Sequence, residues 1–182
     1  MTVGLLLAAG EGSRFGGPKA LARDDDGTSW LLRAVQALRP CEEIVVVLGA
    51  EARRASALLP MSVSRIRAED WAEGMGASLR AGLEALARTD HDSVLVSLVD
   101  LPDVDAAVVS RVLDAVPGRR GDLARAAYEG VPGHPVLLGR DHWAGVVASA
   151  TGDRGARDYL AAHDVVLVEC GDLATGVDVD QR

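Results

Sequence analysis

The chain contains 182 residues with a mass of 19.0 kDa and has a formal net charge of −8 at pH 7. This length is enough for one domain with a substantial core, and we expect residues 1–182 to form a single domain. The acidic balance, with a pI of about 4.9, disfavours a general nucleic-acid-binding protein, which needs a basic face. Lysine and arginine total 19, and Lys19 is the one lysine among them.

The first apolar run, from Val3 to Ala9, is too short to span a membrane. No basic residue precedes it and Glu11 follows it, so it is a poor candidate for a secretory signal. Cys41 and Cys170 lie far apart in the chain and match no metal or redox spacing. We therefore expect a cytoplasmic protein that binds neither a membrane nor nucleic acid.

Short apolar runs alternate along the chain with Ala-rich stretches of helical periodicity. In chain order, this predicts a strand at 3–8, a helix at 30–38, a strand at 43–48, a helix at 51–59, a short strand at 63–67 and a helix at 77–87. A strand at 93–99 and a helix at 105–116 follow, then a hairpin of strands at 123–128 and 131–138, helices at 141–149 and 154–163, and a strand at 165–169. The alternation indicates an α/β fold with a mostly parallel sheet, in which the loops after the strands bind the ligand.

A glycine-rich loop follows the first expected strand directly. Four glycines occur in the eight positions Gly10–Gly17, so the backbone can approach a ligand closely and present consecutive N–H groups. Such a nest binds anions, and Arg14 and Lys19 add positive charge at its two sides. Phosphate is the natural ligand for this arrangement.

Two well-known phosphate-binding loops differ from this segment in detail. The dinucleotide fingerprint has glycine where Phe15 stands, and the ATP-type loop has Gly-Lys-Ser or Gly-Lys-Thr where this chain has Pro18-Lys19-Ala20. The simplest alternative is a turn that only reverses the chain. Such a turn has no need of the two cationic side chains.

The run L-A-A-G-x-x-x-R-x-G-x-x-K resembles the signature of MobA-like nucleotidyltransferases and is most similar to molybdenum cofactor cytidylyltransferases. This resemblance implies a Rossmann-like three-layer α/β/α nucleotidyltransferase fold. It also implies transfer of a nucleoside monophosphate from an NTP, here CTP, to a phosphorylated acceptor. The nucleotide-binding residues that it implies in this loop are Leu7, Ala8, Ala9, Gly10, Gly12, Ser13, Arg14 and Lys19.

A second motif joins a loop to the helix expected at 77–87. Gly74 and Gly76 form a flexible lip, and the hydroxyl of Ser78 in the first helical turn can hydrogen-bond a base edge or a phosphate. An ordinary helix N-terminus is the alternative. The segment W-A-E-G-M-G-A-S-L-R-A-G resembles the family motif that lies beside the nucleotide base and ribose. The resemblance assigns Gly74 and Ser78 to the nucleotide and favours the cytidylyltransferase branch over the guanylyltransferase branch.

Asp100 ends a buried strand, which is the ligand-binding position of this fold class. Mg²⁺ prefers one or two carboxylates together with substrate phosphates, and Asp100 fits that role. Its alternative role is to cap a turn, although Asp103 or Asp105 is a more suitable helix cap. The segment resembles the family's D-x-P motif, which implies that Asp100 holds the catalytic Mg²⁺.

Asp178 and Asp180 follow the last expected strand. Alternation in an extended segment places both side chains on the same side, and the spacing leaves open which of them meets the metal. The segment resembles the family's D-x-D-T-P-E-D motif, which completes the metal site, but Gln181 and Arg182 stand where Thr and Pro are usual. A solvated acidic tail is the alternative interpretation.

Two further segments resemble motifs of the cytidylyltransferase branch near the acceptor pocket: G-V-P-G-H-P-V-L-L, which contains His134, and G-D-R-G-A-R, which contains Arg154 and Arg157. They imply a molybdopterin acceptor whose terminal phosphate pairs with Arg154 or Arg157. They also imply a molybdoenzyme or its maturation factor as a partner. A histidine between glycine and proline is more often structural than catalytic, so His134 is assigned to binding.

The implied reaction is attack of the acceptor phosphate oxygen on the α-phosphorus of CTP, with release of pyrophosphate. The nucleophile is already anionic, so catalysis consists mainly of positioning and charge stabilisation by Arg14, Lys19 and the Mg²⁺ at Asp100. Three alternatives stay open. They are a sister enzyme that uses GTP or another phosphorylated acceptor, a nicotinamide-dependent oxidoreductase, and a non-catalytic cofactor-binding module.

Overall fold

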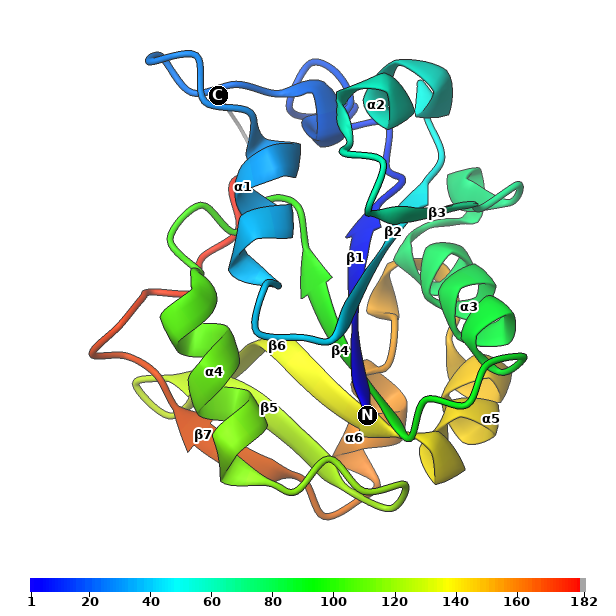
Figure 1. The fold of residues 1–182 in the computed structure, drawn as a ribbon, viewed down its shortest axis with the longest axis vertical. Coiled ribbons are helices and arrows are strands. Elements are labelled where there is room, and N and C mark those ends of the chain that lie inside the picture. Colours follow the sequence, from blue (N-terminus) through cyan, green and yellow to red (C-terminus); the bar gives the residue numbers. More distant parts are fainter. Residues whose placement is uncertain (181–182) are drawn as a thin grey trace.

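Seven strands form one sheet in the computed structural model of the protein, which describes residues 1–180. The order across the sheet is β3-β2-β1-β4-β6-β5-β7 (Figure 1). Among these strands only β6 runs against its neighbours, which confirms the predicted mostly parallel sheet. Gln181 and Arg182 lie outside the described residues. The strands are β1 (Thr2–Ala8), β2 (Glu43–Leu48), β3 (Ser64–Arg67), β4 (Ser93–Leu98), β5 (Leu123–Tyr128), β6 (Val131–Gly139) and β7 (Val166–Glu169).

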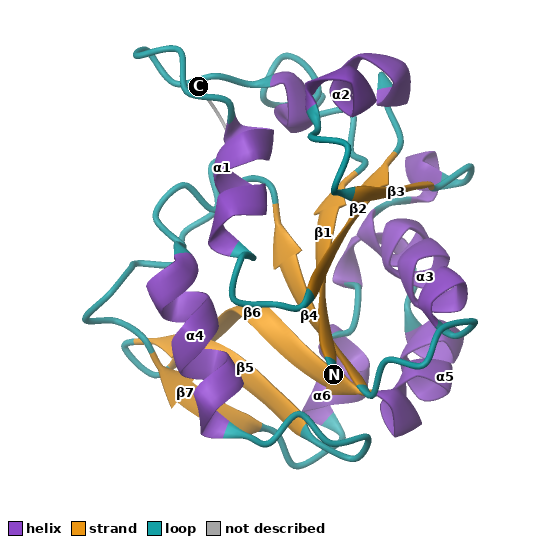
Figure 2. Cartoon of the chain, viewed as in Figure 1, coloured by secondary structure: helices purple, strands orange, loops and turns teal. Residues whose placement is uncertain are grey.

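Helices cover both faces of the sheet and give the predicted three layers (Figure 2). One face packs against α1 (Trp30–Ala37), α2 (Ala52–Leu58) and α4 (Ala106–Ala115), and the other against α3 (Met75–Leu86), α5 (Arg140–Ser149) and α6 (Arg157–Ala161). Alternation along β1 explains the two cores, because Leu6 and Ala8 join the first and Leu5 and Leu7 the second. No helix within residues 1–180 is long and apolar enough to cross a membrane.

The predicted hairpin is confirmed, since β5 and β6 are antiparallel and Tyr128 pairs with Val131. Glu129 and Gly130 both have positive φ angles, 52° and 78°, as in the tight turns that match the twist of a hairpin. The prediction of one helix over residues 154–163 is wrong for its first residues. A short 3₁₀ turn and α6 replace it, because Gly155 between them has a φ of 52°.

The order of the central strands creates a crevice at their carboxyl ends. The chain leaves β1 toward β2 on one side, and β4 later pairs with β1 on the other side. Ligands of open α/β sheets bind at such a switch point, outside the carboxyl ends of the strands. The loops that follow β1 and β4 therefore define the candidate site.

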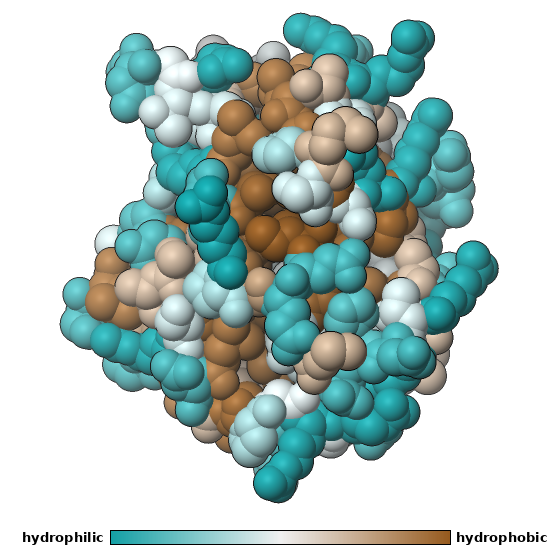
Figure 3. Space-filling view, in the orientation of Figure 1, coloured by the Kyte–Doolittle hydropathy of each residue, from teal (hydrophilic) through white to brown (hydrophobic). Residues whose placement is uncertain are grey.

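The surface of the face shown in Figure 3 is mixed in character. Hydrophilic residues occupy most of its rim, whereas hydrophobic residues gather between α1 and β1. The strand side chains beneath this face are nevertheless covered, since Leu6, Val46 and Leu95 are fully buried.

Candidate active site

The loop after β1 is folded around the carbonyl oxygen of Gly12. The N–H groups of Phe15, Gly16 and Gly17 donate to this oxygen at 3.0, 2.9 and 3.1 Å. Gly12 has a φ of 61°, and a Cβ there would lie 2.0 Å from the oxygen of Gly17. Position 12 therefore requires glycine for both conformation and space.

This geometry corrects one expectation about the loop. The N–H groups of residues 15–17 already donate inside the loop, so they do not form the free anion nest that was expected over the whole Gly10–Gly17 segment. The N–H groups of residues 10–14 donate to no other oxygen within residues 1–180. The N–H groups without such a partner therefore lie in the first half of the loop, where Ser13 and Arg14 are also exposed.

The three residues before this loop are buried. Leu7 and Ala8 belong to β1, and the carbonyl oxygen of Ala9 accepts the N–H of Ala50 at 2.9 Å. Leu7 also lines the cavity described below. These residues fix the start of the loop, and their side chains are largely unavailable to solvent.

Lys19 lies at the end of the loop, next to the carboxyl end of β4. Its Nζ donates to Asp100 Oδ2 at 2.7 Å and to Asp180 Oδ1 at 3.0 Å. The side chain is 15% exposed. Burial by itself lowers the pKa of Lys19, but the hydrogen bonds and charges of Asp100 and Asp180 outweigh it and raise the pKa above its ordinary value.

Three carboxylates meet beside this ammonium group. Asp100, Asp178 and Asp180 each offer one oxygen, and these oxygens lie within 4.8 Å of one another. The backbone also joins the two segments, since the N–H of Val179 donates to the carbonyl oxygen of Asp100 at 3.1 Å. Oxygen ligands at this density suit a hard divalent cation such as Mg²⁺ or Mn²⁺. The structure thus brings together all three residues that the sequence assigned to a metal.

The two glycine-containing motifs that the sequence placed on the nucleotide and acceptor sides lie against each other. A Cβ at Gly74 would lie 2.6 Å from Asp153 Oδ1 and 2.7 Å from the carbonyl carbon of Gly152. Gly74 also has a φ of 113°. Ser78 is buried in the first turns of α3, with 4% exposure, so its hydroxyl is not presented at the surface as was expected.

A cavity of about 500 Å³ opens next to Asp178. Its walls are mostly aliphatic, and polar groups lie among them. The aliphatic lining is Leu7, Leu79, Val96, Leu98, Leu101, Val136, Leu138 and Leu160. The charged and imidazole groups are Arg125, His134, Asp153, Arg154, Arg157 and Asp178. The predicted acceptor residues His134, Arg154 and Arg157 are therefore brought together here.

His134 is held by its backbone, because its carbonyl oxygen accepts the hydroxyl of Tyr128 at 2.6 Å. Burial, with the nearby charges of Arg125 and Arg157, lowers the pKa of His134 to about 4. The imidazole is therefore neutral at pH 7 and does not add to the positive charge of the cavity.

Arg125 is a further residue of this cavity, and none of the sequence motifs contains it. Its guanidinium donates to the carbonyl oxygen of Gly133 from Nε at 3.2 Å and from Nη2 at 3.1 Å. Burial and the charge of Arg157 lower its pKa, but an arginine stays charged at pH 7. The available signal was a single arginine within the otherwise apolar strand L-A-R-A-A-Y. Arg154, in contrast, is exposed and pairs with Asp158 at 2.6 Å.

Comparisons with known proteins find relatives that match most of this chain. The family model described as a MobA-like NTP transferase domain matches residues 4–166. A nicotine blue oxidoreductase of Paenarthrobacter nicotinovorans is 37% identical over 97% of this chain and 91% of its own length. A molybdenum cofactor guanylyltransferase of Burkholderia ambifaria is 31% identical, over 93% of this chain and 86% of its own. The crystal structure of Rv0371C from Mycobacterium tuberculosis in complex with manganese superimposes with a TM-score of 0.74 at 25% identity, over 98% of this chain and 93% of that one.

Proposed function

The chain belongs to the MobA-like NTP transferase family, and we propose that it transfers CMP from CTP to a phosphorylated acceptor such as molybdopterin, with release of pyrophosphate. The observation that carries this proposal is the cluster of Lys19 with Asp100, Asp178 and Asp180 at the carboxyl ends of β1 and β4. The cluster lies at the ligand-binding edge of the fold and adjoins the cavity through Asp178.

The carboxylate cluster fits a divalent cation. Three oxygens within 4.8 Å of one another are the hard donors that Mg²⁺ and Mn²⁺ take, and the related Rv0371C structure contains manganese. Asp100, Asp178 and Asp180 would hold this cation. When bound, it would neutralise part of the charge on the triphosphate.

Lys19 links the carboxylates to the substrate phosphates. An ammonium group has three N–H donors, and two of them already reach Asp100 and Asp180. The third can donate to the α-phosphate or to the incoming acceptor phosphate. Lys19 thereby draws two anions together, while Arg14, which is exposed at the other side of the loop, is free to neutralise the departing pyrophosphate.

The reaction needs no proton acceptor from the protein. An acceptor phosphate oxygen forms the new bond to the α-phosphorus, and the bond from that phosphorus to the pyrophosphate oxygen breaks. The attacking oxygen is already ionised at pH 7, so positioning and charge stabilisation account for the rate. The neutral imidazole of His134 is therefore a wall of the acceptor cavity and not a base.

The cavity beside Asp178 suits the acceptor. Arg125, Arg154 and Arg157 contribute positive charge to its lining, and the aliphatic walls accommodate the ring system of a pterin. We place this reaction in the cytoplasm, with a molybdoenzyme or its maturation factor as the protein that receives the product. We propose CTP as the substrate because the segment from Trp71 to Gly82 resembles the motif of the cytidylyltransferase branch. The Burkholderia relative, in contrast, is named for guanylyl transfer.

Pyrophosphate release tests the proposal directly. It is measured with CTP, GTP, ATP and UTP in the presence of Mg²⁺, each with and without molybdopterin. We expect release that requires the acceptor and is fastest with CTP. Faster release with GTP would identify the guanylyl-transferring sister enzyme, and no release with any of the four would contradict a transferase.

Lys19 variants provide the residue-level arm of this experiment. We expect Lys19→Ala to lower turnover about 10²-fold or more, as the loss of a preorganised donor to a developing anion does. Lys19→Arg keeps the charge, but its planar fork favours pairing with a single anion. If Lys19→Ala kept full turnover, the proposed catalytic role of Lys19 would be contradicted.

A nicotinamide-dependent oxidoreductase is a second candidate function. It is favoured by the 37% identity to nicotine blue oxidoreductase over almost the whole chain, and by the aliphatic lining of the cavity, which also suits an apolar aromatic substrate. Titration with NADH and NADPH in EDTA separates the candidates. Tight binding without a divalent cation would support the oxidoreductase, and weak binding would support the transferase.

A further inference from the structure

The segment that contains Asp178 and Asp180 has no helix or strand of its own. Residues 170–180 follow β7 as turns and irregular backbone until they reach the end of β4. Irregular backbone does not fix side chains by a repeating hydrogen-bond ladder. The two carboxylates therefore depend on specific anchors elsewhere in the protein.

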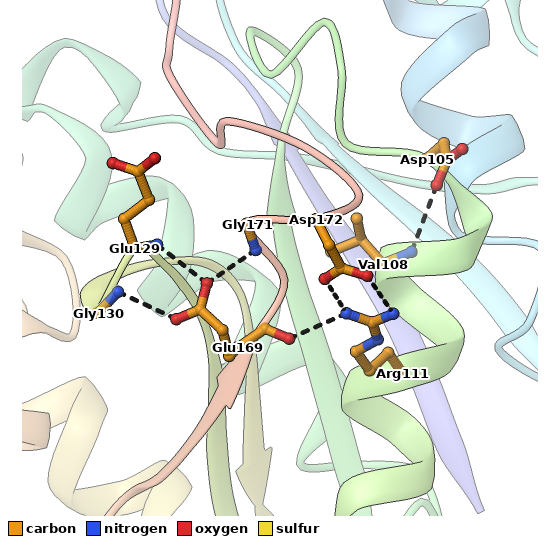
Figure 4. A network of polar contacts seen from close by, with 8 residues as sticks. All are labelled: Asp105, Val108, Arg111, Glu129, Gly130, Glu169, Gly171 and Asp172. Carbon is orange, nitrogen blue, oxygen red and sulfur yellow. Dashed lines mark hydrogen bonds and ion pairs between the residues drawn. The ribbon is translucent and has the colours of Figure 1, made fainter.

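The first anchor lies at the start of this segment (Figure 4). The Glu169 carboxylate accepts the N–H groups of Glu129, Gly130 and Gly171 at 2.9, 3.0 and 2.8 Å. Arg111 on α4 forms an ion pair with Asp172. These contacts hold the start of the segment in place after β7. Asp172 is six positions before Asp178, however, and cannot by itself orient the Asp178 side chain.

The second anchor lies next to the cluster, at Asp103. Its Oδ2 accepts both the N–H and the hydroxyl of Thr175, each at 2.6 Å. Three residues earlier, the carbonyl oxygen of Asp100 accepts the N–H of Val179 at 3.1 Å. The two ends of the short run Asp100–Asp103 therefore hold two points of the C-terminal segment, one on either side of Asp178.

The turn between these two points is tightly packed. Gly176 has a φ of 64°, and a Cβ there would lie 2.1 Å from the ring of Tyr128. The side of the turn that faces Tyr128 therefore has no room to move inward. The direction in which the chain enters this turn is set by Thr175, and hence by Asp103.

Asp103 is not needed by the neighbouring helix. Asp105 caps α4, because its Oδ1 accepts the N–H groups of Ala107 and Val108 at 2.8 and 3.3 Å. The sequence allowed either aspartate to be the cap. In the structure Asp105 is the cap, and the side chain of Asp103 accepts hydrogen bonds from the C-terminal segment instead.

We propose that Asp103, acting through Thr175, is a positioning residue that holds Asp178 and Asp180 beside Asp100. This inference rests on the proposed function, since it assumes that the three carboxylates bind a divalent cation. Partners of metal ligands typically change metal affinity 10- to 100-fold when they are removed. Asp103 acts one step further out, because it bonds Thr175 and touches neither the cation nor the substrate.

Binding of Mn²⁺ alone, followed by the EPR signal of the free ion, tests the proposal without any turnover. We expect Asp103→Ala to weaken Mn²⁺ binding about tenfold or more. Thr175→Val, which loses only the hydroxyl, weakens it less, and Thr175→Ser restores it. Asp105→Ala is the matched control, because it loses the helix cap but is expected to retain the Mn²⁺ affinity of the wild type.

The outcomes separate the two proposals. If the wild-type chain binds no Mn²⁺, both the proposed metal site and this inference fail. If the wild type binds Mn²⁺ and a folded Asp103→Ala chain binds it equally well, only the positioning role fails. Amide hydrogen exchange gives a second measurement, since loss of the Asp103 contact is expected to accelerate exchange at Thr175 and Val179 and not at Glu129. Unchanged exchange at Thr175 and Val179 would overturn the inference.

Discussion

At the scale of single residues, charge pairing explains how the site combines one ammonium with three carboxylates. Lys19 offsets part of the repulsion among Asp100, Asp178 and Asp180, and Asp100 and Asp180 in turn raise its pKa. The one lysine of the chain thus lies where a compact charge with several donors can contact two anions. Arginine, which the chain uses elsewhere, presents a planar fork in place of a point charge.

His134 gives the chain a measurable dependence of stability on pH. Its pKa is about 4 in the folded protein, against about 6.5 in an unfolded chain. Between these values the unfolded state binds a proton that the folded state does not, so stability falls as the pH is lowered from about 6.5 toward 4. The loss attributable to His134 is up to about 2 kcal/mol at pH 5.

Denaturant unfolding of the wild type and His134→Gln at pH 7.5 and pH 5 measures this term. We expect the free energy of unfolding to fall less in the variant than in the wild type over this interval. The fall in unfolding free energy of the wild type minus that of the variant isolates the contribution of His134 from those of the other titrating groups. An equal fall in both proteins would mean that His134 is protonated normally in the folded state.

At the scale of elements, the close approach of α3 to the segment before α6 shapes one wall of the cavity. Gly76 permits it, because a Cβ there would lie 2.9 Å from the Thr151 nitrogen and 3.0 Å from the Ala150 carbonyl carbon. Both neighbours are backbone atoms and cannot rotate away. The glycines of this motif are therefore explained by packing, and not by the flexible lip that the sequence predicts.

We predict that Gly76→Ala destabilises the protein by about 1–3 kcal/mol, the usual cost of overpacking. Gly121→Ala is a suitable control, because nothing lies within 4 Å of its Cβ position and its φ is not in the left-handed region. The control is expected to stay within about 0.5 kcal/mol of the wild type. Denaturant midpoints measure both changes, and equal midpoints for the two variants would refute the packing explanation.

At the scale of the whole molecule, an acidic protein must bind an anionic nucleotide. The net charge is −8, and three of the carboxylates lie at the proposed phosphate site. Lys19 and Arg14 provide local positive charge, but they cannot by themselves balance both the carboxylates and a triphosphate. Nucleotide binding should therefore depend strongly on a divalent cation.

Thermal unfolding with CTP tests this dependence. At a nucleotide concentration 100-fold above Kd, binding adds about 2.7 kcal/mol of stability, which raises Tm by roughly 5–10 °C for a chain of this size. We expect this increase with CTP and Mg²⁺ and a much smaller one with CTP and EDTA. Mg²⁺ without nucleotide serves as the control. Equal increases with Mg²⁺ and with EDTA would contradict the role of the carboxylate cluster.

Hydrophobic patterning predicts nearly all of the elements and their order along the chain, and the motifs identify the candidate metal ligands. Hydrophobic periodicity is a local property, so the runs at 43–48 and 93–99 identify strands without knowledge of their partners. The rule that loops at the carboxyl ends of parallel strands bind ligands then pointed to Lys19 and Asp100. The family resemblance supplied Asp178 and Asp180, and the structure brings all four together.

The pairing and support of these groups, in contrast, depend on contacts between distant parts of the chain. The hydrogen bond from Lys19 to Asp180 joins residues 161 positions apart, and that from Thr175 to Asp103 joins residues 72 positions apart. No local pattern contains such pairs, because they depend on how the loops fold back over the sheet. Three further features depend on tertiary contacts in the same way. They are the inward N–H groups of the glycine-rich loop, the burial of Ser78 and the contribution of Arg125 to the cavity.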